Sequence, residues 1–250
     1  MKIVASYSIK GGVGKTAASV NLAYAAAKAG NETLLIDLDP QGASSFYFRI
    51  GASKKEKRSY FFTKKNRLLS QVKGSNYKRL DILPANLSFR NFDIMLNNMS
   101  KSKQRLKELL SSLKNEYDLI ILDCPPNINL LSENIFNAAD MILVPVIPTT
   151  LSERTYEQLL TFFHKNGYKK KIIRPFFSMA QSKNKLHHNT INDLEKRHPE
   201  FMKSIISFSA EIERMGIHRE PVLAYASRKS KVQSYRTLFN EIVHILAKKK

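Results

Sequence analysis

The order of apolar and polar positions along the chain predicts an alternation of strands and helices. Short runs of aliphatic and β-branched residues recur, with helix-compatible stretches between most of them. These runs are Lys2–Ile9, Glu32–Asp37, Leu80–Leu83, Tyr117–Asp123, Met141–Pro145, Lys171–Ser178 and a segment around Ser204–Ser207. Some contain long stretches without polar residues, which is typical of strands buried on both faces. The pattern predicts a doubly wound α/β fold, in which helices cover both faces of a mostly parallel sheet.

Two helices are expected at particular places. The first should begin near Gly14 and continue through the alanine-rich Asn21–Ala29, where Gly30 provides a C-terminal stop. Toward the other end of the chain, Val232–Ala247 places apolar residues at helical spacing. We expect this segment to be a closing helix that packs on the sheet. The alternative interpretation of the same pattern is a membrane-targeting helix.

The segment Gly51–Arg79 has the least regular pattern in the chain. It is rich in Lys and Arg and has little apolar periodicity, so we expect an exposed, irregular basic insertion. No internal repeat and no separate linker is evident, and 250 residues lie within the usual range for one α/β domain. Residues 1–250 are therefore expected to form a single domain.

Composition adds a strong positive charge. The chain has 41 Lys and Arg residues against 21 Asp and Glu residues, a net charge of +20, which indicates a polyanionic partner bound largely without sequence preference. A lysine-rich solvated surface and an acidic membrane surface are the alternatives. No apolar run approaches the roughly 18–20 residues of a membrane span, and the single cysteine, Cys124, leaves no intrachain disulfide. These features favour the cytoplasm.

The strongest chemical motif is the glycine-rich segment Ile9–Thr16, which lies between the first expected strand and the first expected helix. Glycines allow successive backbone amides to point at phosphate oxygens, and the following helix adds the positive end of its dipole. Lys15 should then reach the β- and γ-phosphates of a nucleotide, and the Thr16 hydroxyl should bind Mg²⁺. Ile9 stands where the ordinary pattern has a glycine. A second lysine, Lys10, is a candidate to reach a nucleotide held by a partner subunit.

Three aspartates follow or end two of the expected strands. Asp37 and Asp39 lie at the end of one, and Asp123 ends another. Because the carboxyl ends of parallel strands gather at the ligand crevice, Asp123 is placed to hold Mg²⁺, directly or through water. Asp39 is placed to orient or deprotonate an attacking water, since phosphoryl transfer needs mainly positioning and charge neutralisation. For any single aspartate, an acid that caps a loop is the alternative.

Three segments in this order and spacing, Lys10–Thr16, Leu34–Gly42 and Leu119–Pro126, resemble the ParA/MinD family of deviant Walker A ATPases. Ser209–Val222 and Tyr235–Phe239 also resemble the C-terminal part of ParA-type partition proteins, so the resemblance covers nearly the whole chain. It implies a P-loop NTPase fold and slow ATP hydrolysis stimulated by a partner protein. It also implies an ATP-sandwich dimer that binds DNA non-specifically and positions a plasmid, a chromosome origin or a protein assembly over the nucleoid.

The resemblance also implies roles for individual residues. It makes Lys10, Lys15 and Asp39 catalytic, with Lys10 contacting the other subunit's nucleotide, and it gives Thr16, Asp39 and Asp123 to Mg²⁺. The residues expected to bind ATP are Lys10, Gly11, Gly12, Val13, Gly14, Lys15, Thr16, Ala17, Asp37, Met179 and Phe208. Ala17 replaces a hydroxyl residue common in the family. Met179 and Phe208 lie in segments that approach the adenine base in the family.

The surface that each branch binds distinguishes ParA-like from MinD-like members. Arg228 matches an arginine that ParA-like members use for DNA, and Lys229 and Lys231 would reinforce it. MinD-like members end in a short amphipathic helix beyond the core, so a membrane-associated positioning ATPase is the less favoured alternative here. Because Met1 leads directly into a strand, no N-terminal helix-turn-helix is expected. A ParB-like or adaptor protein would then supply sequence-specific recognition.

Other classes of protein share this fold. A small-molecule ATP-dependent synthase would use the same phosphate loop but has no need of a large positive charge. An iron–sulfur carrier would need paired cysteines, and Cys124 is alone. A basic DNA-binding protein that has lost hydrolysis is disfavoured by the intact set of Lys15, Thr16, Asp39 and Asp123.

Overall fold

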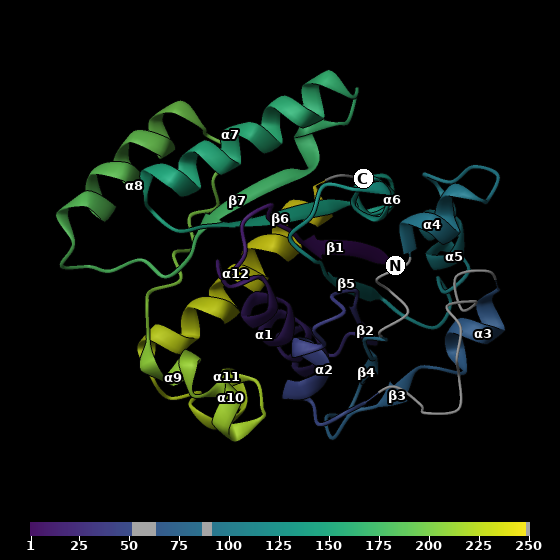
Figure 1. The fold of residues 1–250 in the computed structure, drawn as a ribbon. Coiled ribbons are helices and arrows are strands. Elements are labelled where there is room, and N and C mark those ends of the chain that lie inside the picture. The colour runs from purple at the N-terminus through teal and green to yellow at the C-terminus, as the bar shows by residue number, and fades with distance from the viewer. Residues whose placement is uncertain (52–63, 87–91, 249–250) are drawn as a thin grey trace.

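A seven-stranded sheet forms the centre of the computed structural model, which describes residues 1–51, 64–86 and 92–248 (Figure 1). The strands are β1 (Lys2–Ser6), β2 (Thr33–Asp37), β3 (Lys73–Gly74), β4 (Leu80–Leu83), β5 (Leu119–Asp123), β6 (Met141–Val146) and β7 (Ile173–Phe177). Their order across the sheet is β3-β4-β2-β5-β1-β6-β7, and every neighbouring pair is parallel except β3 and β4. The predicted mostly parallel α/β fold is confirmed.

Helices cover both faces of the sheet (Figure 1). Ile3 and Ala5 of β1 pack in a core cluster with side chains of helices α5 (Arg105–Ser111), α6 (Leu130–Ala138) and α7 (Thr150–Lys165). Val4 belongs to a second cluster, with α1 (Lys15–Lys28) and α12 (Ser230–Ala247). Crossover helices bury both faces of a parallel sheet, which explains why the strand sequences contain so few polar residues.

The remaining described helices include several that add core residues to these two clusters, such as Leu68 and Phe92 in the first and Val222 in the second. They are α2 (Ala43–Tyr47), α3 (Lys65–Leu69), α4 (Phe92–Asn97), α8 (Lys185–Arg197), α9 (Ala210–Glu213), α10 (Met215–His218), α11 (Val222–Tyr225) and the short 3₁₀ helix η3 (Lys170–Ile172). Helix α8 lies beside α7 (Figure 1), where Arg197 forms ion pairs with Glu153 and Glu157.

The first and last helices lie close to their predicted positions. Helix α1 begins directly after Gly14, whose φ of 94° is left-handed, and Gly30 at φ 96° follows its end. Ala23 and Ala26 are fully buried, and their small side chains allow the helix to lie close against the sheet. The glycines are placed at the ends of the helix because left-handed backbone costs them little.

Helix α12 is a core helix. Its apolar stripe is buried and consists of Val232, Tyr235, Leu238, Phe239, Ile242 and Leu246, whereas Val243 is 47% exposed. Because this stripe packs against α1, it is not available to a membrane. In the part of the chain that the structure describes, no helix is both long and apolar enough to cross a membrane.

The strand expected around Ser204–Ser207 is absent, and that prediction is wrong. Only one isolated bridge forms there, between Ala180 and Ser207. The amides of Lys203 and Ser204 instead donate to the carboxylate of Glu241 on α12, at 2.7 and 3.0 Å. The amides of Met202 and Ile206 still donate to the carbonyls of Pro175 and Phe177 on β7, both at 2.8 Å, so Glu241 interrupts the pairing between them and no continuous strand forms.

The expected irregular insertion at Gly51–Arg79 is only partly irregular. Residues 52–63 lie outside the described residues. The rest contains α3 and the antiparallel strand β3, and Leu68 is fully buried in the core. The prediction is wrong for this part, because elements of five and two residues are too short to show a hydrophobic period.

The burial of α12 leads to a stability prediction. Replacing Leu238, which is fully buried, with alanine should lower the free energy of unfolding by about 2–5 kcal/mol, the range for a large core side chain. Val243→Ala, on the exposed side of the same helix, should change it by less than about 0.5 kcal/mol. Urea denaturation measures both. Equal effects of the two substitutions would contradict the assignment of α12 to the core.

Candidate functional site

The glycine-rich loop connects the carboxyl end of β1 to the first turn of α1. Gly12 and Gly14 both have positive φ, at 70° and 94°, so the loop needs glycine at these two positions. A Cβ on Gly14 would also lie 2.8 Å from the Ser178 hydroxyl oxygen, so there is no space for a side chain. Val13 is buried and anchors the loop between them. No side chain caps α1 at Gly14, which leaves the first amides of a 14-residue helix available to an anion.

Lys15 is almost completely buried within this loop. Its Nζ donates to the carbonyl oxygen of Lys10 at 3.1 Å, which closes the loop on itself. Burial lowers the pKa of Lys15, while the nearby charges of Asp123 and Asp39 act in the opposite direction. The structure thus places a buried cation beside carboxylates, as a site for phosphate oxygens and a metal ion requires.

Asp123 ends β5 and is fully buried. Its two carboxylate oxygens accept hydrogen bonds from the hydroxyls of Ser44, at 2.7 Å, and Ser19, at 3.2 Å, and the Thr16 side chain bonds to it as well. Burial raises the pKa of Asp123, and these hydroxyl donors together with Lys15 counteract the rise. The predicted proximity of Thr16 and Asp123 is present in the structure.

Asp37 lies directly beside Asp123, because the two residues are paired in the register of β2 and β5. Its Oδ2 accepts from the backbone amide and the hydroxyl of Ser45, at 2.8 and 2.6 Å. Its Oδ1 has no hydrogen-bond partner although it is buried. Burial, followed by the charge of Asp123, raises the pKa of Asp37 to about 7. The structure therefore brings the two strand-end carboxylates together in a space that disfavours two negative charges.

Asp39 lies in the turn after β2 and is only partly buried. One of its carboxylate oxygens accepts the amide of Gln41 at 2.9 Å. The charge of Asp39 contributes to the environment of Lys15 and of Asp37, so it lies at the same site. Its exposure fits a residue that meets water, whereas Asp37 and Asp123 are closed off.

The sequence did not single out Ser44 and Ser45, which hold the two buried carboxylates. Both lie in the first turn of α2, directly after the segment that carries Asp37 and Asp39. Serine at the start of a short helix after a strand is common enough as a capping residue that the pattern carries no specific signal. Only the fold shows that their hydroxyls point back to the strand ends.

Lys10 is directed away from Lys15. Its Nζ donates to the hydroxyl of Ser152 in the first turn of α7, at 3.1 Å, while its backbone amide donates to the Ser8 hydroxyl at 3.2 Å. Ser152 was also missed in the sequence, although it follows the carboxyl end of β6. The two lysines of the loop thus occupy different positions, one inside the site and one at its outer edge.

The residues expected near the α-phosphate and the adenine base lie at different distances from the phosphate loop. Met179, at a left-handed φ of 54°, reaches over Gly14, with its Cε 3.8 Å from the position of a Cβ there. Ala17 is half-buried in the first turn of α1. Phe208 is 43% exposed, and its amide donates to the Ala180 carbonyl at 2.9 Å. Met179 is therefore at the site, whereas Phe208 is joined to it only through this backbone contact.

The three residues expected to contact DNA lie at the start of α12, apart from the phosphate loop. Arg228 and Lys231 are exposed and form no ion pair with any acidic residue in the described ranges. Lys229 is paired with Glu211. No side chain caps the helix at Lys229, and its first turn contains no acidic residue. Positive charge at a helix N-terminus is unfavourable unless an anion is near, so this end of α12 suits a phosphate.

The residues of the site fit a magnesium ion bound together with a nucleotide. In the described part of the chain, no group of three His, Cys, Asp and Glu side chains gathers to hold a metal alone. Mg²⁺ prefers few protein oxygens together with phosphates and water. The Thr16 hydroxyl bonds to Asp123 and keeps lone pairs for a cation, and the orphaned oxygen of Asp37 is a further acceptor for water at the site.

The raised pKa of Asp37 predicts a pH-dependent cost. The pKa of Asp37 in the folded state lies well above its ordinary value, so the contribution of this group to stability is present at low pH and is lost as the pH rises toward 7. The free energy of unfolding of Asp37→Asn, taken relative to that of the parent, should therefore rise by about 2 kcal/mol from pH 5 to pH 8.

Urea denaturation without nucleotide or Mg²⁺ measures this difference. The control is Asp193→Asn, since the side chain of Asp193 is 73% exposed on α8. The difference between Asp193→Asn and the parent should stay nearly constant from pH 5 to 8. If Asp37→Asn follows the parent in the same way, its carboxylate does not titrate in this range.

Known proteins match the chain over almost its full length. Residues 1–174 match a family model described as an AAA domain. The sporulation initiation inhibitor protein Soj of Bacillus subtilis is 29% identical over 247 residues, which cover 96% of this chain and 98% of Soj. The chromosome partitioning protein ParA of Caulobacter vibrioides strain NA1000 / CB15N is 26% identical, with 97% and 94% covered.

A solved structure is similar over the whole chain as well. The crystal structure of a putative plasmid partition protein of Borrelia burgdorferi bound to AMPPNP superposes with a TM-score of 0.80 at 25% identity, covering 100% of this chain and 99% of that one. The family model covers the phosphate loop and the strands that carry Asp37 and Asp123. With this fold, this site and these relatives, the chain belongs to the ParA/MinD family of deviant Walker A ATPases.

Proposed function

We propose that the protein is an ATP-dependent dimerising switch that binds DNA without sequence preference and hydrolyses ATP to partition or position a cargo. The observation that carries this proposal is the divergence of the two lysines on the phosphate loop. Lys15 is buried beside Asp123 and Asp39, whereas Lys10 extends to Ser152 at the outer edge of the site. One lysine serves the chain's own nucleotide, and the other is free to serve a nucleotide across a dimer interface.

The residues of the site divide the work of ATP hydrolysis. Backbone amides from Gly11 to Thr16 and the Lys15 ammonium bind the phosphates. Thr16 would hold Mg²⁺ together with water, beside Asp39 and Asp123, and the cation would supply charge neutralisation for the phosphates. Because both oxygens of Asp123 already have donors, the role of Asp123 would be to orient the Thr16 hydroxyl and water at this place.

Asp39 is the candidate to position the attacking water. It is the one carboxylate of the three that remains accessible, and one of its oxygens is fixed by Gln41. Positioning of this kind contributes to phosphoryl transfer mainly by holding reactants in line. Slow hydrolysis in the isolated protein follows if Lys10 of the partner has to complete the charge neutralisation.

The charge of the chain favours DNA over a membrane or a small substrate. The net charge of +20 exceeds what a small-molecule synthase needs, and the apolar stripe of α12 is buried in the core. The proposed contacts are Arg228 and Lys231, with Lys229 reinforcing them once it leaves Glu211. A ParB-like or adaptor protein would stimulate hydrolysis, and residues 1–250 would act as one cytoplasmic, nucleoid-associated ATPase domain.

The role of Lys10 predicts a separation of dimerisation from nucleotide binding. Lys10→Ala should abolish the ATP-dependent dimer in light scattering, because the charge that reaches the second nucleotide is lost. ATP affinity of the monomer should change by less than about threefold, since Lys15 is untouched. Lys165→Ala, an exposed lysine at the end of α7, is the control and should dimerise normally. A Lys10→Ala protein that still dimerises with ATP would rule out the sandwich arrangement.

DNA binding should depend on nucleotide and on Arg228. In a gel shift with a random-sequence duplex at near-physiological salt, the parent should be retained with ATP and Mg²⁺ but not with ADP or without nucleotide. Arg228→Glu should weaken this retention by about tenfold or more, because a phosphate contact becomes a repulsion, and should leave the dimer intact.

The control for this experiment is Lys114→Glu, which makes the same change in net charge at an exposed position after α5. It should cause only a small loss of DNA affinity. Equal retention in all three nucleotide states would mean that net charge alone drives binding. Equal losses for Arg228→Glu and Lys114→Glu would place the DNA contact elsewhere on the surface.

A further inference from the structure

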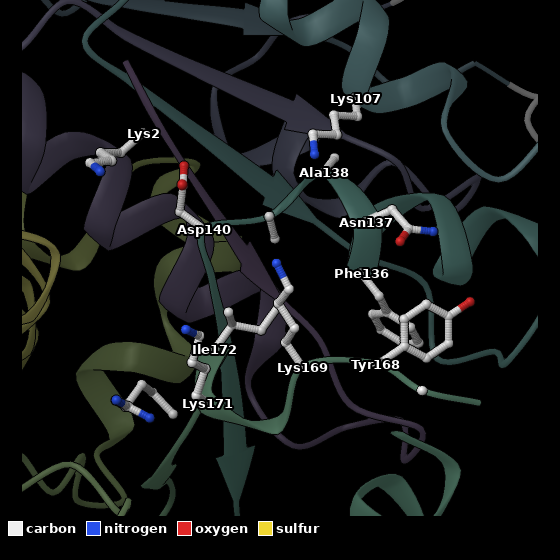
Figure 2. Close-up of a pocket in the computed structure, with 13 residues that line it drawn as sticks. Lys2, Lys107, Phe136, Asn137, Ala138, Asp140, Tyr168, Lys169, Lys171 and Ile172 are labelled. Carbon is white, nitrogen blue, oxygen red and sulfur yellow. The ribbon is translucent and has the colours of Figure 1, made fainter. Parts of the chain in front are cut away.

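A second charged cavity lies at the end of the sheet opposite the phosphate loop. It has a volume of about 770 Å³ and is lined by Lys2, Lys107, Asp140, Lys169, Lys171 and Arg174 together with apolar residues. We call this cavity the basal hollow (Figure 2). Lys2 is the first residue of β1, and Asp140 directly precedes β6. The phosphate loop follows the other end of β1, about 16 Å away along a five-residue strand. The two sites share no residue.

The basal hollow carries an excess of positive charge. Four lysines and one arginine line it, against a single carboxylate, Asp140. One oxygen of Asp140 accepts the amide of Ile3 at 2.8 Å, so this carboxylate also holds the edge of β1. Figure 2 shows the amine of Lys169 pointing toward the middle of the hollow, with Lys107 extending toward it from α5. The cations thus converge on one space.

These cations differ from their neighbours in having no acidic partner. Lys103 and Lys101, just before α5, pair with Glu133 and Glu108, and Arg105 also pairs with Glu108. In the described ranges, none of the five cations of the hollow forms an ion pair; Arg174 donates only to a backbone carbonyl, that of Ile173, at 2.7 Å. Apart from Asp140, which lines the hollow itself, the acids named here are committed outside it, and an anion from solution is the remaining partner for the excess of positive charge.

The shape of the hollow favours a small ligand over a nucleic acid. Its volume lies within the range of about 300–1,000 Å³ that is typical of small-molecule sites. DNA proteins generally spread basic residues over a surface that follows the phosphate backbone, whereas these lysines surround a concavity. Lysine presents a compact charge with three N–H donors, which suits the oxygens of phosphate. Several lysines from different elements suit a ligand with more than one phosphate group.

We propose that the basal hollow binds a small ligand that carries two or more linked phosphate groups, an inorganic oligophosphate or the diphosphate or triphosphate part of a nucleotide. Lys169, directly before η3, Lys171 within it, Lys107 from α5 and Lys2 from β1 contact the phosphate oxygens. Phe136 and Ile172 form part of the apolar floor. This site is independent of the ATP site on the phosphate loop and does not depend on the proposed DNA contacts.

Isothermal titration with inorganic tripolyphosphate tests the proposal. The protein is first saturated with Mg²⁺ and ADP, so that the phosphate loop is filled. One further binding event per chain is expected, and it should weaken with added salt. Lys169→Gln combined with Lys171→Gln should lower the affinity by about tenfold or more, since two charge-assisted hydrogen bonds are lost. Lys169→Arg combined with Lys171→Arg should keep most of it.

A matched control removes two charges elsewhere. Lys196→Gln combined with Lys203→Gln changes exposed lysines outside the hollow, and it should leave the tripolyphosphate affinity within about twofold of the parent. All variants should still bind ADP, which shows that they are folded. A second, weaker ADP event that is lost in the Lys169 and Lys171 double variant would identify a nucleotide as the source of the phosphates. Its absence beside retained tripolyphosphate binding would indicate an inorganic oligophosphate.

Three results would overturn the proposal. The first is no binding of tripolyphosphate to the ADP-saturated protein. The second is an equal loss in the control and in the Lys169 and Lys171 double variant, which would mean that only net charge matters. The third is an unchanged tripolyphosphate affinity together with weaker retention of duplex DNA in the double variant. That last outcome would make the hollow part of the DNA-binding surface.

Discussion

Two buried carboxylates beside one buried ammonium group are the constraint on which the site depends. Asp37 and Asp123 are neighbours in register at the ends of β2 and β5, and both are fully buried. Two negative charges so close together are unfavourable, and burial raises the pKa of each. Hydroxyls from Ser44, Ser45 and Ser19 and the charge of Lys15 oppose this cost. Much of the local structure around the phosphate loop serves to hold these charges in place.

This arrangement links the fold to the chemistry. The parallel sheet brings strand ends from distant parts of the sequence to one edge, and the glycines of the loop allow α1 to begin there. Mg²⁺ and a nucleoside triphosphate would bring compensating charges to this edge, the cation beside the carboxylates and the phosphates beside Lys15. Binding of both is therefore expected to reduce the electrostatic repulsion between the buried carboxylates. The free energy of unfolding should then depend on the bound nucleotide.

The sequence was sufficient to predict the parallel sheet and the phosphate loop, because apolar strand runs and a glycine-rich turn leave strong local patterns. It failed where a single long-range contact decides the structure. The segment around Ser204–Ser207 has strand-like residues, but Glu241 takes the amides of Lys203 and Ser204 and interrupts the pairing with β7. Helix α3 depends on the burial of one leucine, Leu68. Ser44, Ser45 and Ser152 could not be found, since a serine has functional meaning only when the fold shows what it faces.

The central claim is that the carboxylates, Thr16 and Lys15 form a site for ATP and Mg²⁺ together. The most direct measurement is a calorimetric titration of the purified protein with ATP, with Mg²⁺ present and with Mg²⁺ removed by a chelator. The account predicts binding of one ATP per chain that is clearly tighter with Mg²⁺, since a cation is needed beside Asp123. ATP binding that is equally strong without Mg²⁺, or no ATP binding at all, would contradict it.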